Sequence, residues 1–392
     1  MRFRLRGAAA AAVGFVMLAG VAACGGSGGD TPDYGPYSGK PGAADYDQKP
    51  SRSRGVLAES LRLGEHILYA TDIDPELKVG RGGGVFANYR GLESSFISGP
   101  ESDAADGHGP LAAFGALAAN KSYAAGQSEK FLAVSLLEFP DEAAAGAAAA
   151  DMDRADFQAN ADNAPVAVDA FPAAINHWRP GIPTLGSVMA YKSLVIRVYA
   201  QLQDPDLGQL IDMVTRSYQR QIDLLANYTP TPAADLPKMQ LDPDKLLTRV
   251  VQTEEPTPTD MKFVVYGVHA YSVFLASPAE DARKNTDHGV TEVAVSYNKH
   301  LFKMRDEATA KSYAGFLGEL RDGPEFTPMK GVSGLADVTC GQLTKPVPNS
   351  VEARRFRCIV MRGEYVAMVY SNTDTDVRQL AAAQYSVMGG TA

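Results

Sequence analysis

Apolar positions along the chain predict the same strand and helix order twice. In the first half, residues 131–139 are almost continuously apolar, which predicts a strand. A helix is expected to follow and to run to about Phe157, because Asp141 suits the N-cap and Glu142 complements the helix dipole. In the second half, strand-like residues 293–304 precede an apolar pattern of helical spacing. Asp306 begins that helix and follows Asp141 by 165 residues.

A second pair of segments repeats in the same way. Residues 194–202 predict a strand, and a helix is expected from the polar stretch at Asp206 to Leu225. The second copy lies 170 residues later and consists of a predicted strand over residues 365–370 and a predicted helix after Asp376. One short insertion would reconcile the offsets of 165 and 170, so we interpret the pattern as an internal duplication. Convergent patterning of common strands and capped helices is the alternative.

The predicted fold class is α+β, with two tandem and duplicated units. Hairpin turns are expected at Lys192-Ser193 and at Arg362-Gly363-Glu364, which favours mainly antiparallel sheets. Each helix that follows a strand must cover a sheet with its apolar face, and the simplest solution places the helices on one face of each sheet. The Gly-rich residues 81–84 lack the spacing of a phosphate-binding loop and predict a flexible turn.

Prolines separate the two units. We expect a first α+β domain over residues 55–228, a Pro-rich connector over 229–260 and a second α+β domain over 261–392. The prolines of the connector remove backbone donors and favour extended chain. The domain boundary therefore falls in this stretch.

The N-terminus predicts export and lipidation. Three arginines precede an uncharged, weakly apolar stretch that is too short for a comfortable membrane span, so residues 1–23 are expected to be a signal peptide. The last residues before Cys24 resemble the lipobox of bacterial lipoproteins, in which the cysteine thiol carries lipid with fatty acids such as palmitate. Residues 24–54 are rich in Gly, Pro and Ser and predict a flexible tether.

Composition narrows the classes of function. The chain has 392 residues, of which 45% are apolar, enough for one large core or two ordinary ones. Its net charge is −9, which argues against a nucleic-acid partner because phosphate contacts need a basic surface. Six histidines without metal-binding spacing and three cysteines predict no metal site and no cofactor.

The two remaining cysteines, Cys340 and Cys358, predict a disulfide. An exported protein folds in an oxidising compartment, and two leftover thiols are most simply paired there. At the offset of 170, Val188 falls where Cys358 lies, so the first unit is expected to use apolar packing at this place. A redox or nucleophilic cysteine is the alternative, but no C-x-x-C motif supports it.

The candidates for catalysis are few. Ser94 and Ser95 are the best available nucleophiles, and His108 lies in a polar segment with Asp103 and Asp106. We interpret that segment as a solvated loop. No catalytic residue is predicted, although a triad built from distant residues would escape sequence motifs.

With the lipobox, the tether, the duplicated units and the cysteine pair in view, the chain resembles a family of uncharacterised lipoproteins exported by nocardial and mycobacterial-type actinobacteria. Residues 64–75, GEHILYATDIDP, are similar to that family's segment just after the tether. The resemblance implies placement in a cell envelope and transfers no catalytic or binding residue.

These observations favour a non-enzymatic envelope lipoprotein, lipid-anchored to the outer face of the bacterial cytoplasmic membrane. It is expected to bind a small ligand, a wall lipid or glycan, or an envelope protein. The alternatives are an extracytoplasmic hydrolase, and an accessory or sensor lipoprotein for a transporter or signalling partner.

Overall fold

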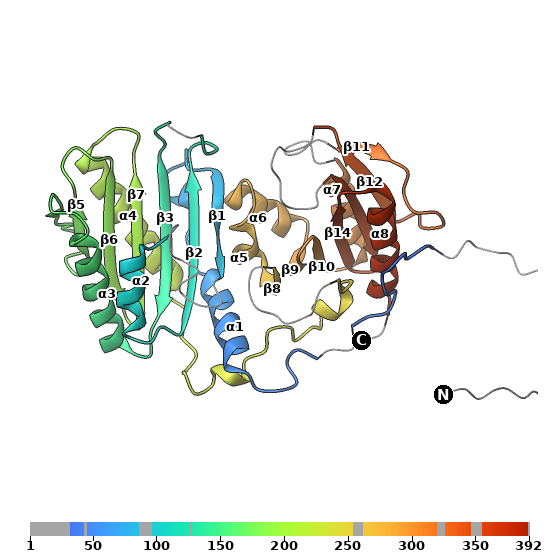
Figure 1. Ribbon diagram of the computed structural model, residues 1–392, viewed down its shortest axis with the longest axis horizontal. Coiled ribbons are helices and arrows are strands. Elements are labelled where there is room, and N and C mark those ends of the chain that lie inside the picture. The colour runs from blue at the N-terminus through green and yellow to red at the C-terminus, as the bar shows by residue number, and fades with distance from the viewer. Residues whose placement is uncertain are drawn as a thin grey trace, which may run out of the picture. The chain divides into compact units, whose positions relative to one another are not determined.

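The computed structural model describes residues 32–42, 45–85, 96–124, 127–253, 262–319, 326–345 and 355–390 (Figure 1). Within these ranges no helix combines the length and the apolar character that crossing a bilayer requires. Cys24 lies outside the described residues.

Seven antiparallel strands form the sheet of the first domain, in the order β1-β2-β3-β7-β6-β5-β4. They are β1 (Val79–Val85), β2 (Ala112–Ala119), β3 (Phe131–Glu138), β4 (Ala164–Pro165), β5 (Ile175–Trp178), β6 (Thr184–Tyr191) and β7 (Leu194–Gln201). The helices of this domain are α1 (Arg52–Gly64), α2 (Gly99–Asp106), α3 (Glu142–Phe157) and α4 (Leu207–Leu225).

The sheet of the second domain also has seven antiparallel strands, in the order β11-β12-β13-β14-β10-β9-β8. They are β8 (Phe263–Gly267), β9 (Val290–Ser296), β10 (Lys299–Met304), β11 (Phe326–Met329), β12 (Val338–Leu343), β13 (Phe356–Arg362) and β14 (Tyr365–Ser371). The helices are α5 (Val268–Ser272), α6 (Pro278–Asp287), α7 (Glu307–Glu319) and α8 (Asp374–Met388).

The two sheets share one topology. Numbered from the first strand of each domain, both run 1-2-3-7-6-5-4 across the sheet. In both, a long helix follows the third strand and another follows the seventh. The α+β class and the two-unit organisation predicted from the sequence are therefore confirmed, and the shared connectivity is what a duplication predicts.

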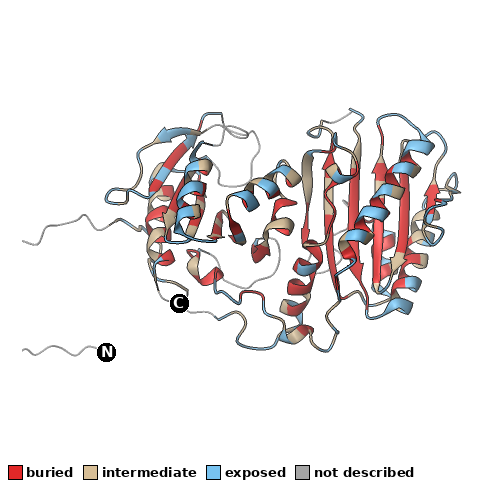
Figure 2. Cartoon of the chain, turned by 180° about the vertical axis from the view of Figure 1, so that it is seen from behind, coloured by how far each residue is buried: buried red, intermediate tan, exposed pale blue. Residues whose placement is uncertain are grey.

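Helices cover both faces of each sheet, whereas the sequence led us to expect helices on one face only. Alternate residues of β3 enter different cores: Leu132, Val134 and Leu136 pack in the core that contains residues of α4, whereas Ala133 and Leu137 pack in the core of α2 and α3. Figure 2 shows the strands largely buried between helices whose outer sides are exposed. The physical reason is that β3 is apolar on both faces, and both faces must be covered.

Local signals explain the repeated helices and hairpins. The Asp141 carboxylate accepts a hydrogen bond from the Ala144 backbone N–H at 2.8 Å, as the predicted N-cap requires. Asp306 accepts from the Thr309 N–H at 2.8 Å at the start of α7. Both predicted hairpin turns form, with Lys192 and Gly363 at φ of 53° and 56°.

Two segments predicted as irregular are regular structure. Residues 99–106 form α2, so Asp103 and Asp106 lie on a helix and not in a solvated loop. Residues 81–84 belong to the edge strand β1 and not to a turn. Gly83 has a φ of 152°, and a Cβ there would meet the Gly115 carbonyl oxygen at 2.5 Å, so the strand needs glycine.

The predicted tether, residues 24–54, differs from the structure in its second part. Tyr34, Tyr37 and Tyr46 pack against the core of the second domain. The Tyr37 hydroxyl also donates to the Asp376 carboxylate at 2.7 Å. Three tyrosines in an otherwise polar segment supply enough apolar surface to hold it in place, and composition alone did not reveal this.

Between the domains, the connector forms 3₁₀ turns at Leu236–Lys238 and Leu247–Arg249. Leu246 and Leu247 of this segment are buried in the core of the second domain.

Candidate functional site

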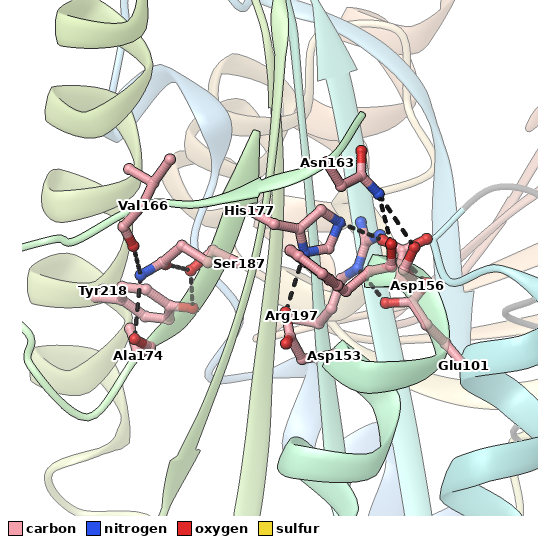
Figure 3. Close-up of polar contacts among 12 residues, drawn as sticks. Glu101, Asp153, Asp156, Asn163, Val166, Ala174, His177, Ser187, Arg197 and Tyr218 are labelled. Atoms are coloured by element: carbon pink, nitrogen blue, oxygen red, sulfur yellow. Dashed lines mark hydrogen bonds and ion pairs between the residues drawn. The ribbon is translucent and has the colours of Figure 1, made fainter. Parts of the chain in front are cut away.

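A charged cluster lies beneath α3 in the first domain (Figure 3). His177 on β5 is 9% exposed, and its two ring nitrogens face two carboxylates of α3. Nδ1 lies 3.0 Å from Asp153 Oδ1, and Nε2 lies 3.3 Å from Asp156 Oδ2. One strand and one helix thus hold an imidazole whose two nitrogens each face a carboxylate.

The cluster continues to a buried ion pair. Arg197 on β7 donates to both oxygens of Glu101 on α2, at 3.1 and 3.2 Å, and lies 3.8 Å from Asp156. Glu101 also accepts from the Ser98 N–H as part of a capping box that starts α2. Three buried or partly buried acids thus surround two cations.

The arrangement keeps His177 protonated. Burial alone would lower the pKa of His177, but hydrogen bonds and charge from Asp153 and Asp156 outweigh it and raise the pKa to about 9. An imidazolium that donates both protons to carboxylates cannot act as a general base near neutral pH. No three His, Cys, Asp or Glu side chains in the described ranges could hold a metal ion. The cluster therefore joins α2 and α3 to the sheet.

The opposite face of the same strands corresponds to the disulfide of the second domain. Aligning the hairpin turns at Lys192 and Gly363 gives an offset of 171, so Ser187 corresponds to Cys358. The expectation that Val188 occupies this place was one residue off. A one-residue slip moves a side chain to the other face of a sheet, so the difference decides which core it enters.

In the first domain, hydrogen-bonded side chains occupy the position that corresponds to the disulfide of the second domain. The Cα partner of Ser187 is Asn176, just as the partner of Cys358 is Cys340. Ser187 donates to the Asn176 side chain and lies 2.6 Å from the Tyr218 hydroxyl on α4. In the second domain Cys340 and Cys358 are bonded, which confirms the predicted disulfide.

The second domain has a pocket of about 430 Å³ between α7 and strands β11, β12 and β13. Its apolar lining includes Phe326, Pro328, Ile359 and Met361. Arg357 on β13 also lines it. A pocket of this size, mostly apolar with a few polar groups, is typical of sites for small molecules.

Glycines open this pocket on the side of α7. Gly315 and Gly318 line it, and a Cβ added at either would meet no heavy atom within 4 Å. Counting from the helix starts at Asp141 and Asp306, Gly318 corresponds to Asp153. The helix of the second domain therefore presents no side chain where that of the first presents a carboxylate.

On the sheet side, the pocket is lined by Gly341, which corresponds to His177 of the first domain. Gly186 corresponds to Arg357 at the hairpin offset of 171. Their Cα partners are His177 and Gly341, so His177 corresponds to Gly341. The pocket thus occupies the place that the Asp153–His177 pair fills in the first domain.

The residues singled out from the sequence as candidate nucleophiles are not brought together within the described residues. Ser94 and Ser95 lie outside the described ranges. The His108 Nε2 lies 2.8 Å from Asp151 Oδ2, within hydrogen-bond distance, on a partly exposed part of the domain.

The residues that form the two sites carry sequence signals that we did not use. Arg197 and Arg357 each interrupt an apolar strand, and a cation within such a strand needs a partner or a special setting. Ser98 and Glu101 have the spacing of a capping box before a helix.

Comparisons with known proteins identify the family. Residues 46–241 match the N-terminal domain of unknown function DUF7373, and residues 246–390 match its C-terminal domain. No curated protein matches. Among solved structures, the extracellular domain of PknH from Mycobacterium tuberculosis is similar at 12% identity and a TM-score of 0.28. The match covers 44% of this chain and 98% of that one, a similarity too low to inform fold or function. The chain belongs to the DUF7373 family and carries both of its domains.

Proposed function

We propose that this protein is an exported, non-enzymatic lipoprotein that binds a small molecule of the cell envelope in the pocket of its second domain. Lipid on Cys24 would anchor it to the outer face of the cytoplasmic membrane. The pocket of about 430 Å³ is the observation that carries the binding role.

Export is supported by two independent features. The N-terminal arginines, the short apolar stretch and the lipobox-like residues before Cys24 are typical of a lipoprotein signal. The Cys340–Cys358 disulfide is typical of proteins that fold outside the cytosol. The resemblance to exported actinobacterial lipoproteins agrees with both.

Binding fits the pocket better than catalysis. Its described lining contains neither histidine nor serine, and the sulfur of Cys340 is held in a disulfide. The described lining therefore holds neither a Ser–His nor a Cys–His catalytic pair. The mostly apolar walls instead favour a ligand with an apolar body.

The binding role can be tested by filling the pocket. Gly318→Leu places a side chain in open space, and replacing a helical glycine should stabilise α7 by about 1 kcal/mol, so misfolding would not explain a loss of binding. Gly146→Leu is the matched control, because Gly146 lies on the corresponding helix α3, also with open space around its Cβ position.

The full-length protein would be purified from membranes in mild detergent and studied by native mass spectrometry. We expect a bound small molecule on the wild type and on the Gly146→Leu variant, and none on the Gly318→Leu variant. Equal occupancy of all three proteins, or none on the wild type, would overturn the binding role.

The anchor is tested separately with Cys24→Ser. This variant should lose its fatty acids and leave the membrane fraction, while the disulfide and the binding behaviour of the folded domains stay unchanged. Unchanged membrane partitioning would contradict the lipid anchor.

A further inference from the structure

We propose that the ligand of this pocket is an amphiphile with an anionic head group, a carboxylate or a phosphate, which the guanidinium of Arg357 binds. The inference rests on the proposed binding function and names the class of ligand.

Arg357 is a half-buried cation in the wall of the pocket. Its Nη2 donates to the Leu317 carbonyl oxygen at 3.2 Å, and its guanidinium carbon lies 4.3 Å from the centre of the Phe326 ring. Tyr370 also hydrogen-bonds to it. Among the described residues no carboxylate lies within ion-pair distance of Arg357. The partners that the structure describes for Arg357 are all uncharged.

The buried arginine of the first domain, Arg197, has an acidic partner, whereas Arg357 has none in the part of the chain that the structure describes. Arg197 makes two hydrogen bonds to Glu101 and lies close to Asp156. A guanidinium has five donors in a fork that fits a carboxylate or phosphate. Arg357 therefore has donors left for a ligand in the pocket, whereas those of Arg197 are largely used within its own domain.

Burial makes an uncompensated charge costly, and an anion removes that cost. Loss of hydration lowers the pKa of Arg357, but a guanidinium stays protonated in proteins. An anionic head group beside it would form charge-assisted hydrogen bonds, which are about twice as strong as neutral ones.

The other charged residues of the pocket contribute little to ligand selection. Lys311, Glu319 and Asp337 line it but are exposed, so water and salt screen them. Ile359 is buried in the pocket floor and offers apolar contact to the body of an amphiphile. Head-group selection is therefore assigned to Arg357.

Isothermal titration calorimetry on the full chain would use four probes with one apolar chain and different head groups: dodecanoate, dodecyl phosphate, dodecanol and dodecyltrimethylammonium, all below micelle formation. We expect the wild type to bind at least one of the two anions about tenfold or more tightly than dodecanol. The stronger anion shows which head group, carboxylate or phosphate, the site takes. Dodecyltrimethylammonium should bind most weakly.

The preference should depend on Arg357 alone. Arg357→Met keeps the apolar length of the side chain and should reduce the anions to the affinity of dodecanol, while dodecanol binding stays within about twofold. Arg357→Lys should restore part of the preference. Arg355→Met removes an exposed positive charge two residues away and should leave the preference intact.

Two failures are distinguishable. Equal wild-type affinity for all four probes, with binding lost in Gly318→Leu, would leave the pocket as a binding site and overturn the anionic head group. An anion preference that survives in Arg357→Met would also overturn it. No binding of any probe to the wild type would overturn the proposed binding function itself, and this inference with it.

Discussion

The two domains hold different structures at the same place on the same fold. Beside the helix that follows the third strand, the first domain places the Asp153–His177 pair and the second places Gly318 and Gly341. The first domain also holds a buried arginine, Arg197, that its own chain neutralises, and the second holds a half-buried arginine, Arg357, that lines the pocket. The same fold thus carries a charge cluster at this place in one domain and a pocket in the other.

The largest expected effect comes from breaking the charge cluster. Arg197→Met leaves Glu101, which is fully buried, without its ion-pair partner. Removing one member of a buried pair typically costs about 3–5 kcal/mol, and we expect a loss of that order in the free energy of unfolding. Urea unfolding measures it. A loss below about 1 kcal/mol would contradict a stabilising role for the Arg197–Glu101 pair.

The next effect is a dependence of stability on pH. The pKa of His177 is raised from an ordinary 6.5 to about 9 in the folded protein. Its contribution is therefore fully present below pH 6.5 and is lost as the pH rises through about 9. The loss between pH 6 and pH 10 should be at most about 3 kcal/mol, since one pKa unit corresponds to about 1.4 kcal/mol.

His177→Gln is the control for this titration. The variant should be less stable at pH 6 and should approach the wild type at pH 10, because other titrating groups are common to both proteins. A constant difference between the two proteins across this range would contradict the assignment of an imidazolium.

The smallest effect has the opposite sign. Arg357→Met removes a half-buried cation that has no carboxylate partner among the described residues. In ligand-free protein we expect the free energy of unfolding to stay equal or to rise by about 1 kcal/mol, because an apolar side chain avoids the desolvation cost. Urea unfolding of delipidated protein measures it. A loss as large as that of Arg197→Met would make Arg357 a structural residue.

The sequence predicted the features that depend on neighbours along the chain. The cap at Asp141 and the hairpin at Lys192-Ser193 are local, and both formed as expected. The disulfide followed from the cysteine count. The two-sided covering of the sheets was also readable, since residues 131–139 are apolar on both faces, but we placed the helices on one face only.

The sites depend on register, which the sequence did not give. The hairpin turns give an offset of 171 between the copies, whereas the sequence match of Asp206 with Asp376 gave 170. Asp206 is the N-cap of α4, but Asp376 lies inside α8, which begins at Asp374 and not after Asp376 as we expected. The difference between the two offsets led us to Val188 in place of Ser187. Whether Arg357 has an acidic partner depends on how α7 packs on β13, a contact between segments that sequence spacing cannot place.

The most direct test introduces an acidic residue into the pocket of the second domain, as the first domain has an acid beside its buried arginine. Gly318→Asp places a carboxylate in the pocket, beside the Leu317 carbonyl that Arg357 contacts, and Gly318→Asn has nearly the same shape without the charge. Calorimetry with the preferred anionic probe should show at least about tenfold weaker binding to Gly318→Asp than to Gly318→Asn, with dodecanol affinities alike. Equal affinities of the two variants for the anion would contradict the account.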